Sequence, residues 1–183
     1  MKSPCQMPSV LEVQTVALYS EECRMKPKPF RPEATGLDDC YVRDQETGLV
    51  WHRCEMRTLY ADTDRSSVVY HANYLRYFEF GRTSLMRYAA YPYREIEESG
   101  YLYPIIELGI CFHEPLFYDD LMLVYTRPAE LERVKLRFDY VITHPETGGI
   151  ICKGFTRHCA LNSSGKPVAV DPKTVHLWKT FPQ

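Results

Sequence analysis

The most informative stretch of this sequence is Arg57-Thr-Leu-Tyr-Ala-Asp-Thr-Asp-Arg-Ser-Ser-Val-Val-Tyr-His-Ala-Asn-Tyr74. It places Asp62 and Asp64 in a polar loop directly before a segment with helical periodicity. The first backbone N–H groups of a helix lack internal partners, and the helix dipole places partial positive charge there. We therefore expect a carboxylate loop delivered to a helix N-terminus, where negative charge can be stabilised.

The longest helix is predicted directly after this loop, over Asn73–Ala90. Its apolar residues recur at helical spacing, and Pro92 ends the pattern. A short second helix is predicted over Tyr93–Ser99, stopped by Gly100. The stripe of the long helix comprises Tyr74, Phe78, Leu85 and Tyr88, with Tyr77 and Gly81 beside it.

Strands are predicted on both sides of the helix. Gly48–Tyr60 precedes it, with Val50, His52, Cys54 and Met56 on one face. The strands expected after it are Tyr103–Phe112, Leu121–Arg133, Lys135–His144 and Ile150–Asn162, with Pro167–Trp178 as a further extended edge or tail. Short connections favour antiparallel neighbours, and one long apolar helix needs a sheet to bury it. We predict an α+β domain over residues 48–183, an antiparallel sheet wrapped around one long central helix.

Residues 1–47 are predicted to form an N-terminal extension. The segment Lys26–Pro32 has prolines at alternate positions, which removes backbone donors and favours an extended connector.

Composition excludes several classes of protein. The net charge is −2 and no long basic run is present, which argues against nucleic-acid binding. No stretch approaches the ~20 apolar residues of a membrane-spanning helix, and the N-terminus does not resemble a secretory signal, so a cytoplasmic location is predicted. The seven cysteines form no CxxC pair, which argues against a disulfide framework and a zinc site.

The loop and helix resemble the signature of the 4-hydroxybenzoyl-CoA thioesterase family, whose members have the hotdog fold. The resemblance spans about residues 53–171. The matching residues in the loop are Thr63, Asp64, Val68, Val69, Ala72, Asn73 and Tyr74, together with Tyr70-His71. Weaker matches follow at Arg82, Glu114-Pro115, Tyr118, Asp120 and Phe138-Asp139-Tyr140.

The resemblance implies hydrolysis of an acyl-CoA thioester to the free acid and CoA. Asp64 corresponds to the family's catalytic carboxylate, and the backbone N–H of His71 to the group that polarises the thioester carbonyl. No metal and no separate redox cofactor is implied. The family's active site lies at a dimer interface, which implies a homodimer or homotetramer. The family usually has glycine at the position of Ser67, which raises the question of whether Ser67 accepts a positive φ.

Each candidate residue also has a structural interpretation. Asp64, the candidate nucleophile or general base, would by itself be interpreted as a helix cap or an ion-pair partner of Arg57 or Arg65. Asp62 fits a loop carboxylate that binds backbone N–H groups. His71 fits either a general base or a residue engaged only through its backbone.

The candidate oxyanion and substrate-binding residues are Tyr70, Ser67, Asn73, Tyr74 and Glu79. Asn73 fits a helix cap with a second role in orienting the loop, and the tyrosines fit core or dimer contacts. Glu79 fits a surface pair with Arg82 at i,i+3 spacing. Two other functions stay open: a hydratase or dehydratase of acyl thioesters, because the hotdog fold hosts both chemistries, and a non-catalytic acyl-binding protein.

Overall fold

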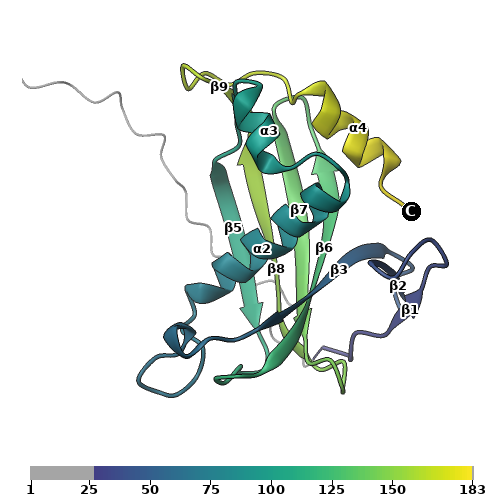
Figure 1. The fold of residues 1–183 in the computed structure, drawn as a ribbon, viewed down its shortest axis with the longest axis vertical. Helices are drawn as coiled ribbons and strands as arrows, with labels where there is room; N and C mark the ends of the chain where they lie inside the picture. The colour runs from purple at the N-terminus through teal and green to yellow at the C-terminus, as the bar shows by residue number, and fades with distance from the viewer. Residues whose placement is uncertain (1–26, 183) are drawn as a thin grey trace, which may run out of the picture.

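A single antiparallel sheet dominates the computed structural model, which describes residues 27–182 (Figure 1). Its strands follow the order β1 (Pro32–Ala34), β2 (Tyr41–Asp44), β3 (Val50–Arg57), β6 (Leu121–Leu131), β7 (Lys135–Thr143), β8 (Ile150–Cys159) and β5 (Ile105–Phe112). The remaining elements are η1 (Tyr60–Asp62), α2 (Asn73–Tyr88), α3 (Tyr93–Glu98), the pair β4 (Tyr101–Leu102) and β9 (Leu161–Asn162), and α4 (Pro172–Thr180). This arrangement confirms the predicted α+β class.

Helix α2 lies across one face of the sheet and supplies the centre of the core (Figure 1). Phe78 stacks on Tyr140 of β7 at 4.3 Å between ring centroids. Gly81 lets the helix approach β6, because a Cβ at this position would lie 2.8 Å from the Val124 side chain. The predicted apolar stripe is therefore confirmed, except that Tyr88 is 42% exposed.

The opposite face of the sheet carries a second, smaller core. Phe30 is buried there, with its ring 4.5 Å from Tyr125 and 6.0 Å from Trp51. Its N–H donates to the carbonyl of Gly148 at 3.0 Å. The proline-rich connector thus crosses this face, and β1 and β2, which both lie in the predicted extension, join the sheet beside β3. Residues 1–26 of that extension lie outside the described residues.

The structure confirms the strand predicted before the loop but not the extended segment predicted at the end of the chain. The predicted strand face of Val50, Cys54 and Met56 is confirmed, with His52 buried among them. The prediction of an extended piece over Pro167–Trp178 is wrong, because its second half forms α4. Asp171 caps this helix by accepting a 2.9 Å hydrogen bond from the N–H of Thr174, and proline occupies the first turn, where a missing N–H costs nothing.

Among residues 27–182, four cysteines are free thiols, namely Cys40, Cys54, Cys152 and Cys159. Cys111 on β5 is disulfide-bonded, although the spacing of the cysteines argued against a disulfide framework. Cys159 and its neighbour His158 lie on opposite faces of β8, with His158 buried inside, as alternation along a strand requires.

Candidate active site

The loop between η1 and α2 closes on itself and presents Asp64 at its tip. Thr63 and Val69 face each other as an antiparallel bridge. Inside it, the N–H of Asp64 donates to the carbonyl of Val68 at 2.9 Å, and the N–H of Ser67 donates to the carbonyl of Asp64 at 3.0 Å. Ser67 has φ +64°, so this residue does take up the left-handed conformation for which the family uses glycine.

The Asp64 carboxylate is exposed and lightly held. Its Oδ1 accepts one hydrogen bond, of 2.7 Å, from the N–H of Ser66. Among residues 27–182, Asp64 forms no ion pair, and Arg57 pairs instead with Asp119. Helix α2 has no side-chain cap. Neither structural role proposed for Asp64 is therefore present, and the carboxylate is available to a bound molecule.

Asp62 holds this loop against helix α2. Its side chain is fully buried, and Oδ2 accepts from the Tyr77 hydroxyl at 2.9 Å and from the N–H of Leu59 at 3.0 Å. Oδ1 pairs with Arg76 at 2.7 Å. The expected role in binding backbone N–H groups is confirmed at Leu59. The bonds to two α2 side chains add that Asp62 fixes the loop to the helix.

The helix entry provides a backbone donor. The N–H of Tyr70 donates to the carbonyl of Asp62 at 2.9 Å, and the amide of Asn73 donates to the same oxygen at 2.8 Å. Within the described part of the chain, no acceptor is recorded for the N–H of His71. The turn therefore leaves His71 with a free N–H one residue before Ala72, the N-cap of α2.

The other candidate residues take different positions around this entry. Tyr74 is buried, its ring 5.0 Å from Phe112 of β5, and burial raises its pKa to about 12. Tyr70 is 44% exposed and its ring contacts that of His71. Asn73 orients the loop rather than capping the helix.

Glu79 is exposed on α2, and the predicted pair with Arg82 is not formed among the described ion pairs. Arg82 turns inward instead, with Nη1 at 3.1 Å from both ring nitrogens of His158. Burial and the orientation of α2 decide this, because Arg82 contacts β8 whereas Glu79 faces solvent.

The loop docks on a segment that the sequence did not assign to the site. The N–H of Val69 donates to the carbonyl of Leu116 at 2.8 Å, and Val68 pairs with Phe117 in an isolated bridge. The match of Glu114-Pro115 to the family pattern was the sequence feature that could have identified this segment as part of the site. Tyr60 and Tyr118, both largely exposed, meet edge-on beside this segment at 5.6 Å.

Asp64 lies on an open surface. A pocket of about 490 Å³ lies beyond the other end of α2, between the residues that directly follow this helix and α4, and Asp64 is not among its lining residues. Pocket size therefore does not identify the site.

Comparison with known proteins decides the family. A family model described as the thioesterase-like superfamily matches residues 58–177, which include the Asp64 loop, α2 and the strands that follow. The chain belongs to the thioesterase-like superfamily. The resemblance found in the sequence is thereby confirmed, and the sheet around α2 is the hotdog fold of this superfamily.

Individual relatives agree with this assignment. The chain is 34% identical to a putative acyl-CoA thioesterase, YneP, of Bacillus subtilis over 115 residues, which are 62% of this chain and 83% of that protein. It is 26% identical to the acyl-CoA thioester hydrolase YbgC of Escherichia coli over 51% of this chain and 70% of that protein. A crystal structure of a hypothetical protein from Aquifex aeolicus aligns with a TM-score of 0.65 at 28% identity, covering 69% and 98% of the two chains.

Among residues 27–182, no three His, Cys, Asp or Glu side chains come together as metal ligands would. No helix in the same range combines the length and the apolar character that crossing a membrane requires.

Proposed function

We propose that this protein hydrolyses acyl-CoA thioesters, with Asp64 as the catalytic carboxylate. The observation that carries the proposal is the pairing of an available carboxylate at Asp64 with a free backbone N–H at His71, both held at the entry of α2 by Asp62. Membership in the thioesterase-like superfamily and the names of the relatives support the same reaction.

Two routes use these groups. As a nucleophile, Asp64 forms a bond to the thioester carbonyl carbon, the C–S bond breaks, CoA leaves as the thiolate, and water then hydrolyses the acyl–aspartyl anhydride. As a general base, Asp64 takes a proton from water while the water oxygen attacks the same carbon. In both routes the N–H of His71 donates to the oxyanion that develops on the carbonyl oxygen.

A single-turnover reaction in ¹⁸O-labelled water, combined with trapping of the acyl–enzyme, separates the two routes. If Asp64 is the nucleophile and water attacks the aspartyl carbon of the anhydride, unlabelled aspartate oxygen appears in the acid product and label enters Asp64. The label goes directly into the product if Asp64 is the base, and also if water attacks the acyl carbon of the anhydride, so a trapped covalent acyl group on Asp64 distinguishes these two cases. Mass spectrometry of both species reads out the result.

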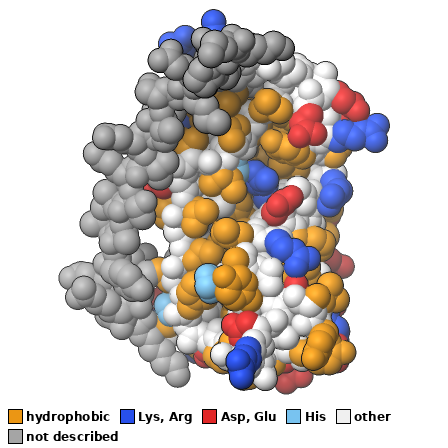
Figure 2. Space-filling model, turned by 90° about the vertical axis from the view of Figure 1, so that its left-hand side faces the viewer, with side chains coloured by type: hydrophobic (Ala, Val, Ile, Leu, Met, Phe, Trp, Pro, Cys, Tyr) orange, Lys and Arg blue, Asp and Glu red, His pale blue; other side chains and the backbone are white. Residues whose placement is uncertain are grey.

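We further propose a homodimer formed along β5. This strand ends the sheet, and exposed apolar side chains follow it, namely Ile105, Ile106, Leu108 and Phe112, each 43–49% exposed. Figure 2, which views the molecule from the side of β5, shows hydrophobic side chains gathered here. An exposed apolar edge favours association, and a two-fold axis would pair β5 with its copy.

Such a pairing would bring the second copy to the catalytic loop. Tyr74, in the first turn of α2, contacts Phe112 at the end of β5, so the strand edge and the helix entry adjoin. A copy seated on β5 would cover the open side of Asp64. Whether two such dimers form a tetramer is a separate question, for which mass measurement in solution is the test.

The test of the activity is the loss of thioester ultraviolet absorbance over a panel of acyl-CoAs, with wild type and Asp64→Asn compared. The amide keeps the shape but can neither attack nor accept the proton, so we expect turnover to fall by roughly 10²–10⁴-fold. Asp119→Asn is the matched control, since it makes the same change on a neighbouring exposed loop.

Equal turnover in wild type and Asp64→Asn would remove Asp64 from the chemistry while leaving the reaction. An absence of turnover on every acyl-CoA would favour a carrier-protein thioester or a binding role. A cytoplasmic location remains a prediction, which localisation of the tagged full-length chain would test.

A further inference from the structure

A small pocket lies between α2, α3, α4 and β7, far along the helix from the catalytic loop. Its walls are mostly apolar side chains. The space left is about 10 Å³, which is roughly the room that one water-sized particle needs. The lining residues are Arg82, Met86, Tyr93, Ile96, Tyr103, Leu136, Phe138, Thr174 and Trp178.

Two buried N–H donors that line this pocket have no acceptor. Within residues 27–182, neither of these nitrogens, Nε of Arg82 and Nε1 of Trp178, has a hydrogen-bond partner, and the hydroxyl of Thr174 in the same lining has none either. Trp178 is only 9% exposed. The two nitrogens can only donate, the hydroxyl can donate or accept, and a buried donor without an acceptor destabilises the folded state. The pocket therefore offers hydrogen-bond donors to a molecule or ion that can accept from them.

The charge of Arg82 is also uncompensated. Among the described residues, no carboxylate lies within ion-pair distance of its guanidinium, which instead faces the Tyr93 ring at 5.4 Å and the buried ring of His158. Arg82 is only partly buried, but the part of its side chain that faces the pocket meets mostly apolar walls, where a counter-charge would be favourable. An anion in the pocket would balance the positive charge of Arg82 and accept hydrogen bonds from the unpartnered donors.

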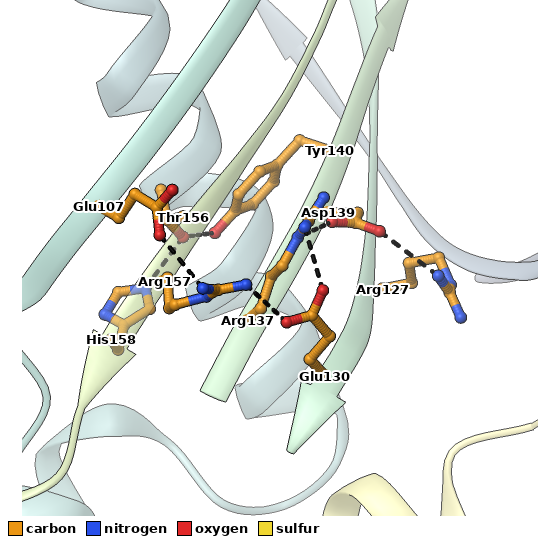
Figure 3. Close-up of polar contacts among 9 residues, drawn as sticks. All are labelled: Glu107, Arg127, Glu130, Arg137, Asp139, Tyr140, Thr156, Arg157 and His158. Carbon is orange, nitrogen blue, oxygen red and sulfur yellow. Dashed lines mark hydrogen bonds and ion pairs between the residues drawn. The ribbon is translucent and has the colours of Figure 1, made fainter. Parts of the chain in front are cut away.

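His158, the buried ring beside Arg82, is neutral and does not change the charge balance of the pocket. Its Nδ1 lies 2.8 Å from the carbonyl of Tyr103 and so carries the proton, while Nε2 lies 2.9 Å from the Thr156 hydroxyl, which also contacts Tyr140 (Figure 3). Burial, followed by the charge of Arg82, lowers the pKa of His158 to about 4. The ring is neutral at pH 7 and leaves the positive charge of Arg82 in place.

We propose that this pocket binds one halide ion, chloride in the cell, between Arg82 and Trp178. The small volume favours a monatomic anion, and the apolar walls favour an anion that loses its hydration shell readily. Halides meet both conditions. The flexible thioether of Met86 provides the adjustment for an ion slightly larger than water.

Bromide quenching of Trp178 fluorescence tests this site. The chain has two tryptophans, so Trp51→Phe leaves Trp178 as the sole indole. Bromide is exchanged for gluconate at constant ionic strength. A halide bound against the indole gives saturable quenching, whereas random collisions with a buried ring give a weak linear dependence. Arg82→Gln should convert the first behaviour into the second.

Thermal unfolding of the full wild-type chain gives an independent measurement. Bromide at ten times its dissociation constant should raise the folded-to-unfolded ratio about elevenfold relative to gluconate. Trp178→Phe should reduce that gain while keeping the packing. A crystal grown in bromide should show anomalous signal beside Arg82 and Trp178. Linear quenching with no halide-specific gain in stability, or a pocket occupied by water alone in that crystal, would overturn the proposal.

Discussion

The hydroxyl of Tyr77 lies 2.9 Å from Oδ2 of Asp62 and donates a hydrogen bond to it inside the core. Both residues are fully buried, and burial, with the hydrogen bond to Asp62, raises the pKa of Tyr77. The bond connects the second turn of α2 to the loop that carries Asp64. Stability and loop geometry therefore depend on the same contact.

Tyr77→Phe should lower the free energy of unfolding by about 1–3 kcal/mol, because the buried carboxylate loses a donor that water cannot replace. Urea denaturation measures the change. Tyr88→Phe is the matched control, since Tyr88 is 42% exposed and its hydroxyl has no bond recorded within residues 27–182. Equal losses in the two variants would show that Asp62 does not need the Tyr77 hydroxyl.

Ser67→Gly should stabilise the protein by up to about 1 kcal/mol. Ser67 has φ +64°, a conformation that costs a residue with a Cβ about 1–2 kcal/mol, and the greater freedom of glycine in the unfolded chain returns part of the gain. The thermal midpoint should rise accordingly. Ser66→Gly, next to it but without a positive φ, should give no gain, and a gain there would point to general loop effects.

His52→Phe should reduce the sensitivity of the fold to acid. Burial lowers the pKa of His52 to about 4, against an opposing effect of Asp38, while the unfolded chain titrates near 6.5. The unfolded state then binds more protons between these values, so stability is complete above pH 6.5 and is lost as the pH falls towards 4.

At pH 5 this loss amounts to about 2 kcal/mol for His52. The phenylalanine variant, whose ring fits between Tyr41 and Tyr88, should avoid it. Urea denaturation at pH 7 and pH 5 for both proteins gives the comparison. A wild-type loss no larger than that of the variant would mean that His52 is protonated in the folded state.

Glu130→Gln should cost less than about 1 kcal/mol and only at low salt. On the outer face of the sheet, Glu130 pairs with Arg137 at 3.1 Å and with Arg157 at 2.7 Å (Figure 3). These side chains are partly exposed, so solvent screens the pairs. In 1 M salt, where the screening length is about 3 Å, the difference should vanish. Glu33→Gln, on an exposed strand, is the control.

The sequence was most informative where local pattern and tertiary packing agree. The 3.6-residue spacing of α2 and the alternation along β3 were visible because each buries one face against the same core. The ends of elements were less well predicted, and α2 stops at Tyr88 rather than Ala90. The signals for α4 were present in Asp171-Pro172, a cap followed by proline, but the helix is short and its apolar spacing was not recognised.

Candidate site residues divide in the same way. The Asp64 loop could be identified from its motif, but the partners of Asp62 could not, because Arg76 and Tyr77 reach it only once α2 has docked. The contact between Arg82 and His158 of β8 could not be predicted from the sequence either. Spacing at i,i+3 allows a pair with Glu79, whereas burial against β8 decides the actual contact.

The free donor at the entry of α2 belongs to the main chain of His71, so side-chain substitutions do not remove it. Replacing the His71 side chain leaves the amide in place, so an alanine scan would pass over it even if it held the oxyanion. Only a change that deletes the N–H itself, such as proline or a backbone ester introduced by synthesis, would expose its contribution. The side chains that such a scan would report are those of Asp62 and Asn73, which aim the turn.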